Sequence, residues 1–351
     1  MLSSDLLKTE LPMPLLVTGL TGVGGFNAFE YFQSLYPGQV FSIRQASNWP
    51  LNGPGILPCN AEDYDGLRRI FSEHRFRSVL NCAGNCALKS CELDPDMAYR
   101  INLTGVRNLL NVIAEQPDSK SIRLIHVSID LVFSGRGQGG YLESDLKDPV
   151  TIYGKSMAAA EHIVTLERPD APIMRISLPM GISYSGHAGA IDWIQSRFKA
   201  NKPATLYYDE VRTPTYTDCL NRVYHHMLGS RAAGLFNTGG TRRLSLYQIA
   251  QIVNRVGGYD PDLLKGCYRV EAGPIPPRAG NVTMDSKKLA AELGAAPFDP
   301  WPLYEHHVPT HRRWHYERPN DEPGSEELLA AVLYRNPLLK TTGSQSSAWA
   351  R

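Results

Sequence analysis

Residues 14–25 read PLLVTGLTGVGG, and this stretch decides the fold. Its first part, Pro14 to Thr18, is a short apolar run that ends at the glycines, which is typical of a strand buried in a parallel sheet. Glycines follow at positions 19, 22 and 25, and the apolar-rich segment from Phe26 to Phe32 predicts a helix after them. The stretch therefore predicts a buried strand, a glycine-rich turn and a helix in direct succession.

The spacing of the three glycines has a physical reason. The turn needs unusual backbone angles, a bound pyrophosphate needs a close approach to the backbone, and the helix must pack closely against its strand. The free N–H groups at the start of the helix can then receive phosphate charge. The stretch therefore predicts a dinucleotide site in which five residues contact the cofactor: Gly19, Thr21, Gly22, Val23 and Gly25.

Strand and helix patterns keep alternating beyond this stretch. Strands are predicted at 39–43, 78–81, 123–128, 172–176 and 234–237, and long helices at 96–115 and 153–167. Such alternation predicts the α/β class, with a Rossmann doubly wound parallel sheet and a smaller C-terminal substrate domain. The expected domains are 1–182 with 215–240 returning (NAD(P)-binding), 183–320 (substrate-binding), and 321–351 (a peripheral helix and flexible tail).

Composition excludes several classes of partner. Lys plus Arg number 36 against 35 Asp plus Glu, so the chain lacks the basic excess that nucleic-acid binding usually needs. No apolar run approaches the roughly 20 residues that span a bilayer, and the acidic N-terminal stretch does not resemble a signal peptide. We therefore expect a cytoplasmic protein that binds neither nucleic acid nor membrane. The spacing of the six cysteines is not that of a zinc site, so we predict no metal.

The residue after the second predicted strand bears on the choice of dinucleotide. An acidic residue there would bind the ribose hydroxyls of NAD, whereas this chain has Ser42-Ile43-Arg44. The guanidinium group of Arg44 suits the 2′-phosphate of NADP. A surface arginine also has structural explanations, so the sequence favours NADP and leaves NAD open.

From Leu15 to Leu293 the chain resembles the extended short-chain dehydrogenase/reductase family, most closely its dTDP-4-dehydrorhamnose reductase-like branch. The resemblance rests on the glycine turn and on six further motifs: Asn60-Ala61-Glu62-Asp63, Asn81-Cys82-Ala83-Gly84, Ala98-Tyr99-Arg100-Ile101-Asn102, Ser128-Ile129-Asp130-Leu131-Val132-Phe133, Tyr153-Gly154-Lys155-Ser156-Met157 and Arg212-Thr213-Pro214-Thr215. Members of this branch reduce or rearrange sugars attached to a nucleotide. The resemblance implies further cofactor contacts from Asn60, Ala61, Cys82, Ala83, Gly84, Asn102, Ser128, Tyr153 and Leu178.

The catalytic motif departs from this family. The resemblance implies a Ser or Thr that holds the substrate oxygen, a Tyr that acts as acid, and a Lys four residues later that lowers the pKa of the Tyr. Here Tyr153 is present, but Met157 stands in place of the Lys and Ile129 in place of the Ser or Thr. Neither Lys155 nor Ser128 simply substitutes, because each faces another side of its helix or strand. Asp130, next to Ile129, is a further catalytic candidate.

The sequence offers four candidates for substrate binding: Lys89, Glu143, Arg212 and Thr215. For each of them, the alternative is a structural role as a solvated or salt-bridged side chain.

These residues together predict an NAD(P)-dependent oxidoreductase that acts on a nucleotide-linked or related sugar, by a reaction like 4-keto reduction, with an atypical active site. Two alternatives stay open: a non-redox sugar epimerase or dehydratase, and a catalytically inactive NAD(P)-binding regulatory subunit. The retained Tyr153 favours an enzyme, because an inactive subunit is free to lose it. The expected partner is a small molecule, a nucleotide sugar, and the sequence leaves homo-oligomerisation open.

Overall fold

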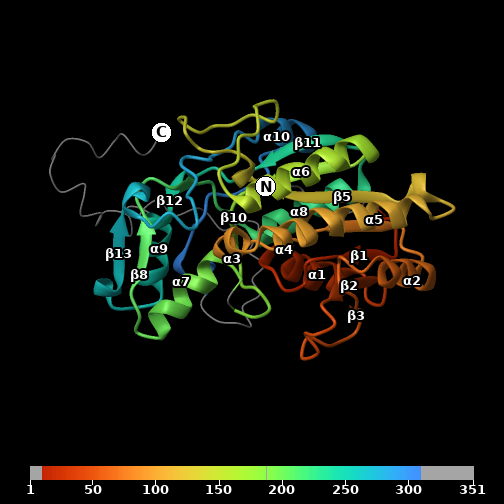
Figure 1. Cartoon of the computed structure of the whole chain (residues 1–351), viewed down its shortest axis with the longest axis horizontal. Coiled ribbons are helices and arrows are strands. Elements are labelled where there is room, and N and C mark those ends of the chain that lie inside the picture. Colours follow the sequence, from red (N-terminus) through yellow and green to blue (C-terminus); the bar gives the residue numbers. More distant parts are fainter. Residues whose placement is uncertain (1–9, 187, 310–351) are drawn as a thin grey trace.

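Seven parallel strands form the central sheet of the computed structural model, which describes residues 10–186 and 188–309 (Figure 1). Their spatial order is β11-β6-β5-β4-β1-β2-β3, so the order reverses between β1 and β4. This arrangement confirms the predicted doubly wound Rossmann sheet, in which ligands bind beyond the carboxyl ends of the strands at the reversal. The strands are β1 (Leu15–Val17), β2 (Val40–Arg44), β3 (Ile56–Pro58), β4 (Ser78–Asn81), β5 (Arg123–Ile129), β6 (Pro172–Ile176) and β11 (Gly234–Thr238).

Helices cover both faces of the sheet, because successive strand residues point to opposite faces and both sets are apolar. Leu16 and Leu124 belong to one buried cluster, with residues of α2 and α5, and Leu15 and Ile125 belong to another, with residues of α1 and α8. The helices are α1 (Val23–Leu35), α2 (Tyr64–His74), α3 (Leu88–Leu93), α4 (Pro95–Tyr99), α5 (Gly105–Ala114), α6 (Ile152–Glu167), α7 (Ala190–Lys199), α8 (Thr217–Gly229), α9 (Leu246–Val256) and α10 (Lys287–Leu293).

The segment predicted as one continuous helix, 96–115, is interrupted. Helix α4 ends at Tyr99, a π-helical turn η2 (Arg100–Thr104) follows, and α5 begins at Gly105. A π turn leaves the general apolar pattern of a helix in place, so the pattern did not reveal it and the prediction of a single α-helix was wrong. Such turns occur often at functional sites, and this one carries Asn102.

Shorter sheets lie beyond the central sheet, with β8, β13 and α9 at the left of Figure 1. Strand β11 follows α8 and pairs with β6, so the chain returns to the central sheet. The predicted tail at 321–351 lies outside the described residues, and the domain limits stay a prediction. The short strands pair as β7 (Pro179–Met180) with β10 (Thr215–Tyr216), β8 (Ala204–Tyr207) with β13 (Leu264–Cys267), and β9 (Val211–Arg212) with β12 (Leu244–Ser245).

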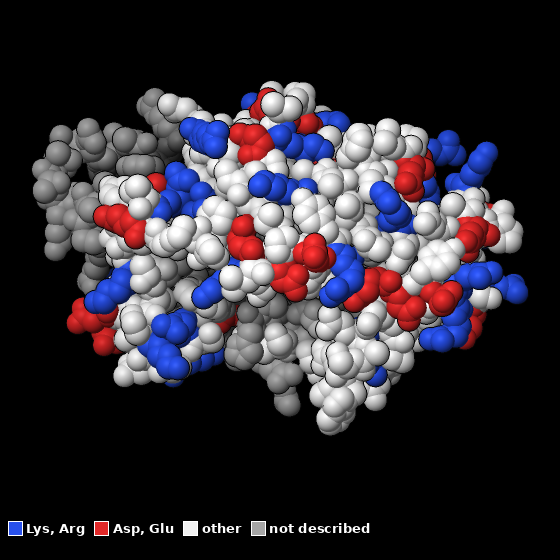
Figure 2. Space-filling view, in the orientation of Figure 1, with Lys and Arg blue, Asp and Glu red and all other residues white. Residues whose placement is uncertain are grey.

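The surface carries both signs of charge. On the face shown in Figure 2, basic and acidic side chains are interspersed, which agrees with the balance of 36 basic and 35 acidic residues in the sequence. Within residues 10–186 and 188–309, no helix is both long and apolar enough to cross a membrane.

Candidate functional site

Two glycines of the turn after β1 are required by close packing. Gly19 has a φ of +75°, in the left-handed region, and a β-carbon there would collide with the carbonyl oxygen of Cys82. A β-carbon at Gly25 would collide with the carbonyl oxygen of Gly19. These glycines therefore let β1, the loop after β4 and the first turn of α1 approach one another closely.

Gly22, by contrast, has room for a β-carbon, which would make only an ordinary van der Waals contact. The nearest described atom to a β-carbon at Gly22 is the carbonyl oxygen of Gly19, at 3.5 Å. Gly22 is the N-cap of α1 and supplies no side-chain cap; Thr21 beside it is exposed, and Val23 begins the helix. The first N–H groups of α1 therefore lack a side-chain acceptor at a place where the backbone is open. This combination fits a pyrophosphate group.

A buried polar network fixes the strand ends beneath the turn. The hydroxyl of Thr18 donates to Oδ1 of Asn81 at 2.6 Å and accepts the N–H of Ala83 at 3.0 Å. Nδ2 of Asn81 lies 3.1 Å from Nδ1 of His126. Burial lowers the pKa of His126 to about 4, so the ring is neutral and Nδ1 accepts this hydrogen bond. The network joins β1, β4 and β5 at the edge where the glycine turn lies.

Asn102 ties the loop after β4 to α6. Its Oδ1 accepts the N–H of Asn85 at 2.6 Å, and its Nδ2 donates to Oγ of Ser156 at 2.9 Å. Ser156 in turn donates to the carbonyl oxygen of Tyr153 at 2.8 Å. The side chain of Asn102 is thus taken up by these contacts, and a β-carbon at Gly84 would lie 3.4 Å from its Oδ1. Asn102 therefore shapes the predicted cofactor loop and links it to the helix that carries Tyr153.

Tyr153 lies in the first turn of α6, whose start is held from two directions. Oγ1 of Thr151 accepts the N–H of Gly154 at 2.9 Å and caps the helix. Gly154 packs so closely on the carbonyl oxygen of Leu131 that a β-carbon would collide with it. Tyr153 is 7% exposed, and its hydroxyl makes no hydrogen bond to any residue that the structure describes. Burial raises the pKa of Tyr153 well above its ordinary value, so this hydroxyl is a neutral donor without a partner.

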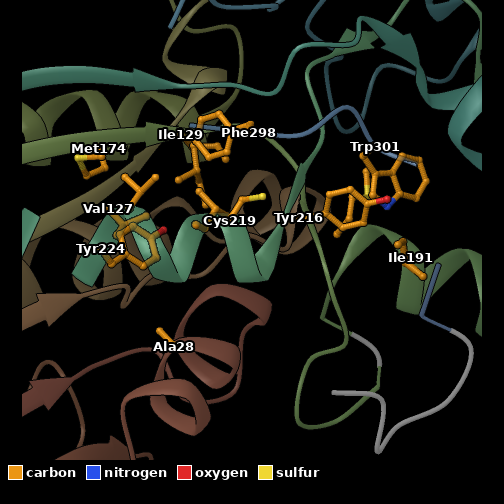
Figure 3. Close-up of a cluster of buried hydrophobic side chains, with 14 of the residues drawn as sticks. Ala28, Val127, Ile129, Met174, Ile191, Tyr216, Cys219, Tyr224, Phe298 and Trp301 are labelled. Carbon is orange, nitrogen blue, oxygen red and sulfur yellow. The ribbon is translucent and has the colours of Figure 1, made fainter. Parts of the chain in front are cut away.

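Met157 and Ile129, which stand where the family resemblance implies a Lys and a Ser or Thr, are apolar and buried, at 3% and 8% exposure. Figure 3 shows Ile129 among other apolar side chains near Cys219 of α8. Ser128 does not supply the missing hydroxyl, because its Oγ donates to Glu161 at 2.6 Å. Lys155 is exposed. None of these residues places a polar group beside Tyr153 in the manner that the family resemblance implies.

Asp130 and Arg212 form a buried ion pair. Arg212 donates to both carboxylate oxygens of Asp130, from Nε at 2.7 Å and from Nη2, and Ser177 donates a third hydrogen bond at 2.6 Å. Nη1 of Arg212 lies 3.6 Å from Oε1 of Glu210. Burial raises the pKa of the Asp130 carboxyl, and Arg212 opposes that rise. The pair joins the turn η4 (Asp130–Val132) to β9, and its polar groups are taken up within the protein.

On the cofactor side, two predicted residues shape the loop after β2. Arg44 ends this strand, and its Nη1 donates to the carbonyl oxygens of Gln45 and Ala46 at 3.0 and 3.1 Å. Its Nε is buried and has no partner among the described residues. Oδ1 of Asn60 accepts the N–H of Ala46 at 2.9 Å. The guanidinium group therefore lies at the same edge of the sheet as the glycine turn, with donor capacity left over.

The substrate-side candidates are placed differently from one another. Lys89 is exposed on α3. The carboxylate of Glu143 accepts the N–H of Asn237 at 2.9 Å and holds its loop to β11. Thr215 is fully buried, its N–H donates to the carbonyl oxygen of Leu178 at 3.0 Å, and its Oγ1 has no partner among the described residues. The structure therefore brings Thr215 and Leu178 together.

The sequence analysis did not predict a buried cluster of charged side chains around Glu161 of α6. Arg175 on β6 donates to both carboxylate oxygens of Glu161 at 2.9 and 2.8 Å, and Lys147 donates at 3.1 Å. Burial raises the pKa of Glu161, but these cations and Ser128 together hold it below its ordinary value. The sequence did hold one indication that Glu161 is buried: it stands four residues after Met157 and therefore shares the same face of the helix. Among the described residues, no three or more His, Cys, Asp or Glu side chains form a group that could hold a metal.

The chain is similar to proteins of two kinds. It is 27% identical to dTDP-4-dehydrorhamnose reductase of Mycolicibacterium smegmatis over 69% of this chain and 72% of the relative. It is 24% identical to methionine adenosyltransferase 2 subunit beta of Rattus norvegicus, over 70% of this chain and 73% of the relative.

A solved structure of dTDP-4-dehydrorhamnose reductase from Bacillus anthracis in complex with NADP superposes with a TM-score of 0.65. The superposition covers 84% of this chain and 96% of that one at 20% identity, which establishes a shared fold. The family described as the RmlD substrate binding domain matches residues 13–304. The match covers most of the chain and confirms the resemblance that the motifs indicated. The chain belongs to the RmlD substrate binding domain family.

Proposed function

We propose that this protein is an NADP-dependent reductase that reduces a carbonyl group of a nucleotide-linked sugar. The observation that carries the proposal is the hydroxyl of the buried Tyr153 side chain, which is neutral and has no hydrogen-bond partner among the described residues. Tyr153 lies at the edge of the sheet that also carries the open glycine turn. A relative named dTDP-4-dehydrorhamnose reductase supports the class of substrate.

The residues at this edge fit the proposed cofactor. Gly22 leaves the start of α1 open to a pyrophosphate, and Arg44 has a buried Nε without a partner among the described residues, at the end of β2 where a 2′-phosphate would be read. Asn60 and Asn102 hold the two loops that flank the glycine turn. When bound, NADPH supplies the hydride.

The chemistry left to the protein is the transfer of one proton. Because burial raises the pKa of Tyr153 well above its ordinary value, the phenol stays protonated at neutral pH. Met157 brings no positive charge that would favour the phenolate. Tyr153 is therefore a proton donor to the carbonyl oxygen as that oxygen gains charge, which suits reduction better than the reverse oxidation.

The direct test is consumption of NADPH. The purified protein would be mixed with NADPH and each member of a panel of nucleotide-linked keto sugars, and the loss of nicotinamide absorbance followed. We expect turnover with at least one keto sugar and none with the corresponding reduced sugars. Tight binding of NADPH with no turnover on the whole panel would contradict the proposal.

We expect Gly22→Ala to weaken NADPH binding without unfolding the protein. The added methyl group has room against the protein, with the nearest described atom at 3.5 Å, but stands where the pyrophosphate would meet the backbone. The dissociation constant, followed by nicotinamide fluorescence, should rise about tenfold, or about 1.4 kcal/mol. Gly24→Ala is the matched control, because a β-carbon at Gly24 meets no described atom within 4 Å. Equal affinities for the two variants would argue against the proposed phosphate position.

We expect Arg44→Ser to remove the preference for NADPH over NADH. A hydrogen bond to a charged group contributes about 1.5–3 kcal/mol, so the affinity for NADPH should fall roughly 10- to 150-fold while the affinity for NADH stays unchanged. Competition binding with both dinucleotides measures the two effects together. Arg107→Ser, at an exposed position of α5, controls for the loss of one positive charge. An unchanged ratio of affinities in Arg44→Ser would show that Arg44 does not read the 2′-phosphate.

A second candidate function is that of a binding subunit without catalysis. It is favoured by the apolar, buried side chains at both Ile129 and Met157. The similarity to a protein named methionine adenosyltransferase 2 subunit beta supports it as well. This function predicts NADPH binding without turnover, so the absorbance assay separates the two candidates.

A further inference from the structure

The stretch after β7 (residues 182–186 and 188–189) crosses the start of α1. A β-carbon at Gly189 would lie 2.5 Å from Cγ2 of Val23, in the first turn of α1. Nδ2 of Asn27, one turn later, donates to the carbonyl oxygen of Ile182 at 3.0 Å. The two ends of the stretch therefore both pack on the beginning of the helix that would receive the pyrophosphate.

The same stretch reaches the loops on either side of the glycine turn. The hydroxyl of Tyr184 donates to the carbonyl oxygen of Pro50, in the loop after β2, at 3.3 Å. Its ring meets that of Phe26 on α1 edge-on, with 5.9 Å between the centroids. The carbonyl oxygen of Ala188 accepts the thiol of Cys86, in the loop after β4, at 3.8 Å. The stretch after β7 thus contacts the loop after β2, α1 and the loop after β4.

These three elements border the proposed dinucleotide site along its length. A dinucleotide lies across the carboxyl ends of the strands on both sides of the reversal in strand order. Here Arg44 would mark the adenosine end of the cofactor, Gly22 the pyrophosphate and Tyr153 the nicotinamide end. A stretch that contacts all three elements would therefore run alongside the whole bound cofactor.

One buried carboxylate ties this stretch together. Oδ2 of Asp192, in the first turn of α7, accepts the hydroxyl of Ser183, its N–H at 2.9 Å and the N–H of Gly189 at 3.2 Å. Oγ of Ser183 in turn accepts the N–H of Ala188 at 3.1 Å. The bond to Gly189 is ordinary helix capping, but Ser183 lies outside the helix, which begins at Ala190. Asp192, at 2% exposure, therefore joins the two ends of the stretch as well as capping α7.

We propose that Asp192 is a positioning residue that holds the stretch after β7 across the dinucleotide site, so that bound NADPH leaves slowly. To leave, the cofactor would have to displace a stretch that is tied at Ser183 and Gly189 and packed on α1. This inference rests on the NADPH site of the proposed function but not on reduction, since a binding subunit would retain its cofactor in the same way.

The test measures the dissociation rate constant of NADPH, by displacing the bound NADPH with excess NADP⁺ and following nicotinamide fluorescence. We expect Asp192→Ala to raise the rate constant about tenfold or more, because one hydrogen bond changes an equilibrium by about two- to twelvefold and this variant removes several. Asp192→Asn should stay near the wild type. Oδ1 of Asp192 has no partner among the described residues, so an amide nitrogen there leaves an acceptor oxygen for the same donors.

Ser245→Ala controls for a loss of stability alone. Oγ of Ser245 caps α9 by accepting the N–H of Gln248 at 3.1 Å, and α9 packs on α7 (Figure 1). Loss of such a cap destabilises a protein, so Ser245→Ala should lower the melting temperature and leave the dissociation rate constant unchanged. Equal rate constants for Ser245→Ala and Asp192→Ala would overturn the proposal.

Hydrogen exchange on the wild type gives a readout that needs no variant, and it decides the matter even if Asp192→Ala does not fold. The amides of residues 182–186 should exchange more slowly with NADPH bound, because the proposal places them against the cofactor. Unchanged exchange there at saturating NADPH, or release of NADPH from Asp192→Ala at the wild-type rate, would overturn the role of Asp192 and leave the proposed function standing. A wild type that binds no NADPH would overturn both proposals.

Discussion

Replacing Tyr153 by Phe should lower kcat by about 10²–10⁴-fold, because general acid catalysis by one positioned group contributes that much. The hydroxyl has no hydrogen-bond partner among the described residues, and the ring is buried at 7% exposure. Its removal therefore costs the fold little while it removes the proton donor. We expect the dissociation constant for NADPH and the melting temperature of Tyr153→Phe to stay close to those of the wild type.

A second buried tyrosine provides the matched control for this variant. Tyr224 on α8 is fully buried, and its hydroxyl also lacks a partner among the described residues. Tyr224→Phe removes the same atom from α8 and should keep wild-type activity. If Tyr153→Phe retained activity comparable to that of Tyr224→Phe, Tyr153 would not be the acid.

Asp130→Ala should destabilise the protein by about 3–5 kcal/mol, because it leaves the buried guanidinium group of Arg212 without its main partner. Arg212 is 3% exposed, so water does not replace the carboxylate. Ser177 also loses its acceptor. Urea unfolding monitored by tryptophan fluorescence measures the difference in the free energy of unfolding.

An exposed ion pair supplies the comparison. Asp118 pairs with Arg77 at 2.7 Å, with 44% and 47% of the two side chains exposed, and such surface pairs contribute at most about 1 kcal/mol. Asp118→Ala should therefore change stability much less than Asp130→Ala. Similar losses in the two variants would show that the Asp130–Arg212 pair does not hold η4 to β9 as the geometry indicates.

The central sheet was predictable because its signals are local. Each strand is a short apolar run, and three regularly spaced glycines mark the turn after β1. The interruption of the 96–115 segment was not predictable, because a π turn at Arg100–Thr104 adds no residue type that marks it. Nor does a local pattern reveal which strands and helices meet, so the cluster of Glu161 with Arg175 was missed.

The sequence identified most residues of the candidate site, but it did not reveal which of their side chains contact one another. The motifs singled out Tyr153, Met157 and Ile129, and the structure places all three side chains in one buried cluster. They also made Asp130 and Arg212 separate candidates for chemistry, whereas these residues, 82 positions apart in the chain, bond to each other.

The account is tested most directly by isotope transfer from NADPH that carries deuterium at the transferred position of its nicotinamide ring. The protein would be incubated with this NADPH and a nucleotide-linked keto sugar, and the sugar product analysed by mass spectrometry. A reductase predicts one deuterium on the former carbonyl carbon for each NADPH consumed. Bound NADPH with no deuterium in any sugar would contradict reduction and point to the binding subunit.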